Sequence, residues 1–265
     1  MHDDITDVPG IRVGHDTNVE AGTGCTVILC DTPAVGGVDV RGGAPATHET
    51  DLLRPLHMVN EVHAVVLTGG SAFGLATTSG VMRYLEERNI GYNTGIARVP
   101  IVSAAAIFDL ALGRPDIRPD AASGYRACEQ ATHGPIPLGN VGGTGATVAK
   151  MRNPLRATKG GLGSASTQLP DGTIVGAIVV VNAVGDIIDP QTQQALTGTH
   201  ASSDQHAQPL KPFSNTTIAV VATSAALNKN ATNKIAQMAH NGLAQAIWPA
   251  HTMFDGDTAF ALALG

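Results

Sequence analysis

An abrupt change of character at Thr216 constrains the fold more than any other feature of this 265-residue chain. Residues 189–215 are rich in Asp, Gln, Thr, Ser, His and Pro, whereas Ile218–Ala222 is an unbroken apolar run. A short apolar run bounded by polar residues is typical of a buried strand. A polar segment of this length inside a compact domain is usually a functional loop or disordered. The sequence therefore predicts a loop that ends where a buried strand begins, with a hydroxyl on the first strand residue.

The rest of the chain predicts an α+β fold with layered sheets. Hydrophobic residues make up 43% of the sequence but aromatic residues only 3%, so the core must be built from closely packed aliphatic side chains. Expected strands and helices fall into separate groups, which argues against a doubly wound sheet. No repeat or domain boundary precedes residue 189, so residues 1–265 are expected to form one domain. Strands are expected over 62–67, 161–169, 172–188, 216–223 and 259–264, and helices after residue 74 and over 120–133 and 231–247.

Charge and hydropathy argue against several classes of protein. The net charge is −6 and no basic cluster occurs, so a nucleic-acid partner is not expected. No segment reaches the roughly 18 apolar residues of a membrane-spanning helix, and the acidic N-terminus lacks the apolar run of a secretory signal. Cys25 and Cys30 bracket an apolar run and Cys128 is the third cysteine, so buried reduced thiols are expected. These features together predict a cytoplasmic protein without membrane contacts.

Two glycine-rich turns, Gly69–Gly74 and Gly142–Thr147, invite comparison with nucleotide-binding loops. Neither has the spacing of a dinucleotide-binding or phosphate-binding loop, so tight turns and close helix packing are the expected roles. A substrate carboxylate bound at the helix start after Gly70 is the alternative. The ten histidines show no metal-binding spacing, so neither a metal nor a cofactor is expected.

Thr216 has two interpretations. The plain one is a β-branched residue at a strand start, where such residues are favoured. In the functional one, Oγ attacks the preceding carbonyl, the acyl group moves from nitrogen to oxygen, and water hydrolyses the ester. The new N-terminal α-amine, with a reference pKa of about 7.7–8.0, can then take the Oγ proton near neutral pH. This hypothesis predicts self-cleavage between Asn215 and Thr216.

A nucleophile of this kind needs an oxyanion donor, a positive charge and carboxylates. Asn182 is a polar residue within a buried strand and is the candidate oxyanion donor. Lys159 stands on a glycine-rich turn suited to close approach and is the candidate cation. Asp255 and Asp257, spaced i and i+2, are candidates for orienting the amine. Each also has a plain structural interpretation: a satisfied core amide, a solvated lysine and the two ends of a turn.

Several longer motifs, in this order, resemble the L-aminopeptidase/D-esterase-amidase family, which includes β-peptidyl aminopeptidases and nylon-oligomer hydrolases. The resemblance covers nearly the whole chain, and the ordered set is far more specific than any single glycine pair. The motifs are Thr6–His15, Arg41–Pro45, Leu67–Leu75, Lys159–Gly163, Asn215–Thr217 and Phe254–Asp257.

The resemblance implies an αββα sandwich similar to that of N-terminal-nucleophile hydrolases, with its own connectivity. It implies self-cleavage into residues 1–215 and 216–265, which stay associated, and a homo-oligomer that is a tetramer or larger. By the same resemblance, the nucleophile is Thr216, while Lys159 and Asn182 assist catalysis and Asp255 and Asp257 orient the site.

Two details of the resemblance bear on the substrate. A threonine nucleophile with a final Asp pair looks like the nylon-oligomer branch, since many members carry Ser and Glu instead. Phe108 falls in the region where some members use a tyrosine near the nucleophile. It is expected to contact the substrate together with Gly70 and Ser71.

The leading hypothesis is thus a self-cleaving amide hydrolase that acts as an aminopeptidase on short peptides or amino-acid amides. An ω-amino-acid oligomer hydrolase of the nylon type is the first alternative. The second, from a different class, is an uncleaved small-molecule-binding protein that keeps the fold and binds its ligand in a glycine-rich pocket.

Overall fold

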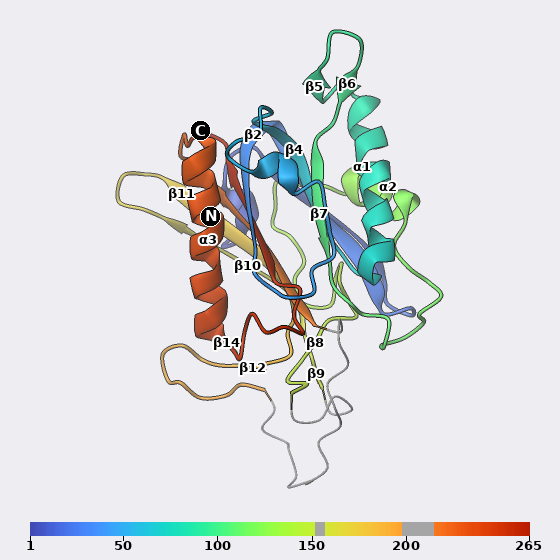
Figure 1. The fold of residues 1–265 in the computed structure, drawn as a ribbon, viewed down its shortest axis with the longest axis vertical. Helices are drawn as coiled ribbons and strands as arrows, with labels where there is room; N and C mark the ends of the chain where they lie inside the picture. The colour runs from blue at the N-terminus through green and yellow to red at the C-terminus, as the bar shows by residue number, and fades with distance from the viewer. Residues whose placement is uncertain (152–156, 198–214) are drawn as a thin grey trace, which may run out of the picture.

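The computed structural model describes residues 1–151, 157–197 and 215–265, and within them nine strands form the main sheet (Figure 1). Neighbouring strands follow the order β10-β11-β13-β15-β2-β4-β7-β3, and β1 pairs with β2 beside this path. The β4–β7 and β13–β15 pairs are parallel and the other pairs antiparallel. The strands are β1 (Ile11–Asn18), β2 (Thr23–Val40), β3 (Thr47–His48), β4 (Glu61–Thr68), β7 (Val102–Ala106), β10 (Gly161–Gln168), β11 (Ile174–Asn182), β13 (Thr216–Thr223) and β15 (Thr258–Ala263).

The long strand β2 divides this sheet into two layers. Its first half pairs with β1 and β4, its second half pairs with β15, and its register against β4 shifts between Leu29 and Ala34. Side chains from both layers, such as Ile28 of β2 and Val220 of β13, belong to one buried cluster. The main core therefore lies between two faces of a continuous, folded-over sheet.

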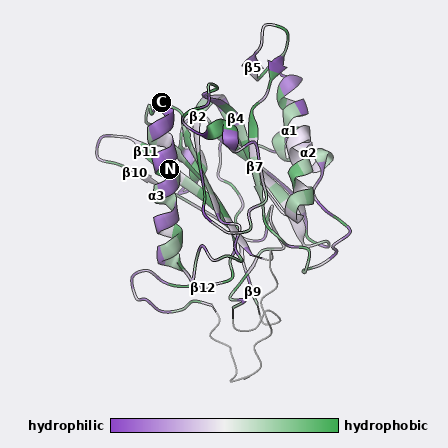
Figure 2. Ribbon diagram, viewed as in Figure 1, coloured by the Kyte–Doolittle hydropathy of each residue, from purple (hydrophilic) through white to green (hydrophobic). Residues whose placement is uncertain are grey.

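The helices cover the outer faces of the two layers. On one side, α1 (Thr77–Glu86) and α2 (Ala121–Glu129) pack on the face of β2 that carries Val27 and Leu29. On the other side, α3 (Lys229–Ala246) lies against β2 and β15, as Figure 1 shows. Figure 2 shows hydrophilic and hydrophobic residues side by side along α1 and α3, as expected of helices with one face on a sheet. This αββα layering confirms the α+β prediction.

The remaining elements are short. Three 3₁₀ segments occur, and three two-stranded ladders join β5 to β6, β8 to β9 and β12 to β14 in the described part of the chain. Their bounds are η1 (Ile5–Asp7), η2 (Asp51–Leu53), η3 (Ser71–Ala76), β5 (Tyr92–Asn93), β6 (Arg98–Val99), β8 (Thr147–Val148), β9 (Thr158–Lys159), β12 (Asp186–Ile187) and β14 (Ile247–Trp248).

Most of the elements predicted from the sequence are present. The strand that begins at Thr216 and the hairpin around Asp171 are confirmed. The strand expected over 172–188 is shorter, because the chain leaves the main sheet after Asn182 and pairs with β14 instead. All three cysteines are buried and free, as expected. Of the predicted polar loop, residues 198–214 lie outside the described residues.

No helix in the described ranges is long and apolar enough to cross a membrane.

Candidate active site

Thr216 lies where three chain segments meet. It is the first residue of β13, is only 4% exposed, and pairs in register with Asn182 at the end of β11. Because directly opposite residues of an antiparallel pair project to the same face, these two side chains are neighbours. On the other side of β13, Asn215 forms a parallel bridge with Asp255, just before β15.

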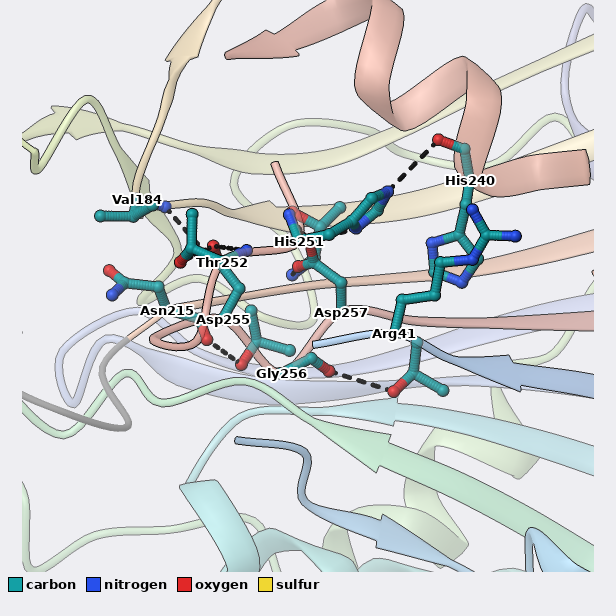
Figure 3. Close-up of polar contacts among 12 residues, drawn as sticks. Arg41, Val184, Asn215, His240, His251, Thr252, Asp255, Gly256 and Asp257 are labelled. Carbon is teal, nitrogen blue, oxygen red and sulfur yellow. Dashed lines mark hydrogen bonds and ion pairs between the residues drawn. The ribbon is translucent and has the colours of Figure 1, made fainter. Parts of the chain in front are cut away.

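The carbonyl group of Asn215 receives two hydrogen bonds. The Thr216 hydroxyl donates to the Asn215 oxygen, and the Gly256 N–H donates to the same oxygen over 2.9 Å. A backbone N–H aimed at a carbonyl oxygen can stabilise negative charge that develops there. A hydroxyl and a backbone N–H therefore both face the carbonyl oxygen of the Asn215–Thr216 peptide bond, and Figure 3 shows Gly256 beside Asn215.

Only glycine fits at position 256. A Cβ there would lie 2.8 Å from Thr216 Oγ and 2.6 Å from the Ala44 carbonyl oxygen. The second contact comes from the segment 41–45, which runs along residues 255–257 and bonds to them through backbone groups such as Ala44 N–H to Asp255 O, at 2.9 Å. Two motifs that are far apart in the sequence, 41–45 and 254–257, therefore lie against each other beside Thr216.

The two aspartates near Thr216 are buried and accept hydrogen bonds from different groups. Asp255 accepts from the Thr252 hydroxyl at 2.5 Å and from the Val184 N–H at 3.3 Å. Its burial, and then the nearby Asp257 charge, raise the pKa of Asp255. Asp257 accepts from the Thr217 N–H at 2.6 Å, which fixes the backbone directly after Thr216.

Asn182 contacts a lysine that the sequence analysis missed. The ammonium of Lys150 donates to both the backbone oxygen and Oδ1 of Asn182, each at 2.9 Å. Oδ1 also accepts from the Thr147 N–H at 2.9 Å, while Nδ2 donates to the Phe108 carbonyl at 3.1 Å. Lys150 is 6% exposed, and burial lowers its pKa to about 7, although the charge on Asp255 opposes the shift. A lysine with this pKa can exchange a proton near neutral pH.

Lys159, the lysine expected from the sequence, lies one ladder away from Asn182. The backbone of Lys159 pairs with Thr147 in the β8–β9 ladder. The Lys159 ammonium donates to the carbonyls of Ala146 and Gly160, each at 3.1 Å. Burial lowers the pKa of Lys159, opposed by the charge on Asp109. Of the two lysines, Lys150 is the one with a hydrogen bond to Asn182. Its only sequence signal was a lysine that ends the mostly apolar stretch 146–150.

The turn after β4 is tied to a buried carboxylate. Gly70 has φ +80°, and its N–H donates to Asp109 at 2.7 Å, while the Ser71 N–H donates to the Ile107 carbonyl at 2.9 Å. Burial raises the pKa of Asp109, and its second oxygen accepts from the Thr23 hydroxyl at 2.7 Å. These two N–H groups are thus already paired within the chain, and the substrate contacts expected of Gly70 and Ser71 stay a prediction. Within the described ranges, no group of three or more His, Cys, Asp and Glu side chains is arranged to hold a metal ion.

Comparison of the sequence with known proteins gives one consistent picture. The profile of peptidase family S58 matches residues 3–265. An uncharacterized aminopeptidase of Mycobacterium bovis is 46% identical over 98% of this chain and 81% of its own length. A 6-aminohexanoate-oligomer endohydrolase of Kocuria sp. is 35% identical over 97% of this chain and 73% of its own length.

Comparison with solved structures finds the same fold in two aminopeptidases. A Burkholderia sp. β-aminopeptidase superposes with a TM-score of 0.75 at 25% identity, covering 99% of this chain and 73% of that one. The L-aminopeptidase D-Ala-esterase/amidase of Ochrobactrum anthropi, described as a variant of the Ntn hydrolase fold, superposes with a TM-score of 0.79 at 21% identity. That match covers 99% of this chain and 74% of the other, and it bears out the sandwich expected from the sequence.

Proposed function

The chain belongs to peptidase family S58, and from that premise we propose that it is an aminopeptidase that activates itself by cutting between Asn215 and Thr216. One observation carries the proposal: the Thr216 hydroxyl and the Gly256 N–H both bond to the carbonyl oxygen of the bond to be cut. The Gly256 N–H also closes the parallel bridge between Asn215 and Asp255. What distinguishes this strand start is therefore the Thr216 hydroxyl, which bonds to the carbonyl oxygen of its own preceding peptide bond.

The proposed self-cleavage proceeds in two steps, an acyl shift from nitrogen to oxygen and the hydrolysis of the resulting ester. Thr216 Oγ attacks the Asn215 carbonyl carbon and an ester forms. The Oγ proton passes to the Thr216 nitrogen, the C–N bond breaks, and that nitrogen leaves as a free amine. Negative charge on the carbonyl oxygen in this step is stabilised by the Gly256 N–H. Water then hydrolyses the ester, which leaves a carboxylate on Asn215 and a free hydroxyl on Thr216. The products are chains of 215 and 50 residues, since 265 − 215 = 50.

In the mature enzyme, the same threonine attacks a substrate amide. Its free α-amine, with a reference pKa of about 7.7–8.0, accepts the Oγ proton and returns it to the leaving amine. Lys150, with a pKa lowered to about 7, is a second group able to move a proton beside Asn182. In this proposal Asn182 supports the nucleophile from the same sheet face, while Asp255 and Asp257 hold the segment that carries the Gly256 N–H. Lys159, further out, balances the charge of Asp109.

The substrates we propose are short peptides or amino-acid amides. The names of the relatives support a second candidate, hydrolysis of ω-amino-acid oligomers, because several of them are 6-aminohexanoate-oligomer endohydrolases. A panel of amino-acid anilides, amino-acid amides and 6-aminohexanoate oligomers separates the two. The homo-oligomeric assembly and the cytoplasmic location expected from the sequence stay predictions.

Intact mass of the purified protein tests the proposal directly. We expect two chains, the second beginning at Thr216, and hydrolysis of at least one amide on the panel. Thr216→Ala should give one uncleaved, inactive chain with an unchanged fold. A wild-type chain that stays intact after long incubation would instead support the uncleaved binding protein, and full amidase activity in Thr216→Ala would refute the nucleophile.

A further inference from the structure

A histidine without a part in the proposed reaction holds one of the site carboxylates. His251 Nδ1 lies 2.8 Å from Asp257 Oδ2, and the His251 backbone N–H donates to the same oxygen at 3.0 Å. The other oxygen of Asp257 accepts from the Thr217 N–H at 2.6 Å. A continuous line of contacts therefore runs from the imidazole ring through Asp257 to Thr217, the residue after Thr216. Figure 3 shows His251 and Asp257 side by side.

The surroundings of His251 favour its protonated form. Nδ1 faces the carboxylate, and Nε2 faces the backbone oxygen of His240 at 3.4 Å, so both ring nitrogens point at acceptors. A neutral imidazole can donate from only one nitrogen, whereas the imidazolium donates from both. The hydrogen bond with Asp257 raises the pKa of His251, while burial and the charge of Arg41 act against the shift.

The other titratable groups around His251 do not take its place as the ionic partner of Asp257. The His240 ring packs edge-on against it, with ring centroids 4.7 Å apart, and burial lowers the pKa of His240. Arg41 pairs with Asp39 at 2.7 Å, and His240 bonds to the backbone oxygen of Asp39 at 3.0 Å. Within the described residues, the ion pair of Asp257 is the one with His251.

The backbone of His251 supports this role. Its φ is +56°, in the left-handed region that residues other than glycine seldom adopt. In this conformation the backbone N–H and the ring nitrogen reach the same carboxylate oxygen. Non-glycine residues in this region are rare outside functional sites and tight turns, and here the conformation serves the contact with Asp257.

We propose that His251 is a positioning residue for the amide hydrolase: its imidazolium orients the Asp257 carboxylate, which fixes the Thr217 amide and with it the strand start that carries Thr216. The inference rests on the proposed function of Thr216. The imidazolium is present below the pKa of His251 and is lost as the pH rises through it. The contribution of His251 to catalysis is therefore largest at low pH and fades at high pH.

Two variants at this position and one control test the inference in steady-state assays from pH 5.5 to 9. His251→Asn keeps an N–H donor near the position of Nδ1, tolerates the left-handed backbone and cannot carry a charge. His251→Ala removes the donor as well. His133→Asn is the matched control, because His133 is 63% exposed and lies outside this cluster. Thermal melts show whether each variant is folded.

For His251→Ala we expect kcat to fall roughly tenfold at pH 6, the size expected for one hydrogen bond to a charged group, with KM changed less than twofold. His251→Asn should fall between alanine and wild type, and its deficit should shrink toward zero as the pH rises. A role in folding alone would reduce activity by one factor at every pH. If the alanine variant does not fold, the pH-dependent deficit of the asparagine variant decides.

Three results would overturn the inference: wild-type kcat in His251→Asn at pH 6, a deficit that does not change with pH, or an effect on KM alone. Histidine NMR titration gives a readout that needs no turnover, with the His251 pKa expected to fall in Asp257→Asn. A wild-type chain that neither cuts itself nor hydrolyses any amide overturns the proposed function and this inference with it. An active wild type with an indifferent His251 overturns the inference alone.

Discussion

Replacing Lys150 with methionine removes a buried charge while keeping most of the side-chain volume. Lys150 is 6% exposed, and burial lowers the pKa of its ammonium from the ordinary 10.5 to about 7. Below about pH 7 both the folded and the unfolded chain carry the proton. Between about 7 and 10.5 only the unfolded chain does, so unfolding takes up a proton in this window. The free energy of unfolding therefore rises with pH there.

The size of this effect follows from the shift. One pKa unit corresponds to about 1.4 kcal/mol, so two units of pH inside the window are worth about 2–3 kcal/mol. Between pH 7 and 9, the free energy of unfolding of the protein that keeps Lys150 should rise by this amount because of the lysine. The Lys150→Met protein should not show this rise. Groups far from Lys150 titrate equally in the two proteins, so the difference between them isolates this lysine together with its interaction with Asp255.

Urea unfolding at pH 7 and 9 measures the difference, with both proteins carrying Thr216→Ala so that each is a single uncleaved chain. Lys234→Met, at an exposed position on α3, is the control and should follow the unvaried chain. In the wild-type background, Lys150→Met should slow amide hydrolysis roughly 100-fold, the usual loss for a group that transfers a proton. An equal pH dependence of stability with and without Lys150 would refute the argument from burial.

Other perturbations have equally direct outcomes. Gly256→Ala places a Cβ 2.6 and 2.8 Å from neighbouring oxygens, one of them Thr216 Oγ. Self-cleavage of the folded protein, followed by intact mass, should therefore slow roughly 100-fold. Cleavage at the wild-type rate would contradict the geometry. Lys229→Met removes an ammonium that donates to three backbone carbonyls at 2.7–2.9 Å. The free energy of unfolding should fall by about 2–4 kcal/mol. An unchanged urea midpoint would show that water replaces the lysine. Burial raises the pKa of Cys30 and of Cys128 to about 12, so iodoacetamide at pH 8 should modify the cysteines only after unfolding, as counted by mass spectrometry.

Sequence reasoning brought together residues that the structure also places side by side, where residue type and local order were enough to pick them out. A hydroxyl residue at the start of an apolar run identified Thr216, and the register of β11 against β13 brings Asn182 beside it. The pair Asp255 and Asp257 also lies at this junction. Thr216 begins β13 and Asn182 ends β11, while Asp255 and Asp257 lie just before β15. Each of these residues borders an apolar run that hydrophobic periodicity reveals.

Long-range placement was beyond the sequence. Lys150 and Lys159 are close along the chain, the first after one glycine-rich segment and the second just before another, and no local pattern shows which of them lies beside Asn182. In the structure, the Lys150 ammonium bonds to Asn182 and the Lys159 ammonium bonds to backbone carbonyls. This difference arises because β8 and β9 pair across the intervening segment. The contact of His251 with Asp257 was hidden for a related reason, since it depends on a left-handed turn that periodicity does not predict.

The sequence by itself determined the α+β class, the strand that begins at Thr216 and, through its ordered motifs, the family. Those features depend on the alternation of apolar and polar residues and on short segments whose chemistry is local. Only the tertiary structure decided which lysine is buried against Asn182, which N–H faces the carbonyl of Asn215, and which histidine pairs with Asp257. The pKa of a lysine and the direction of an N–H are set by what surrounds them, and those surroundings come from segments far apart in the chain.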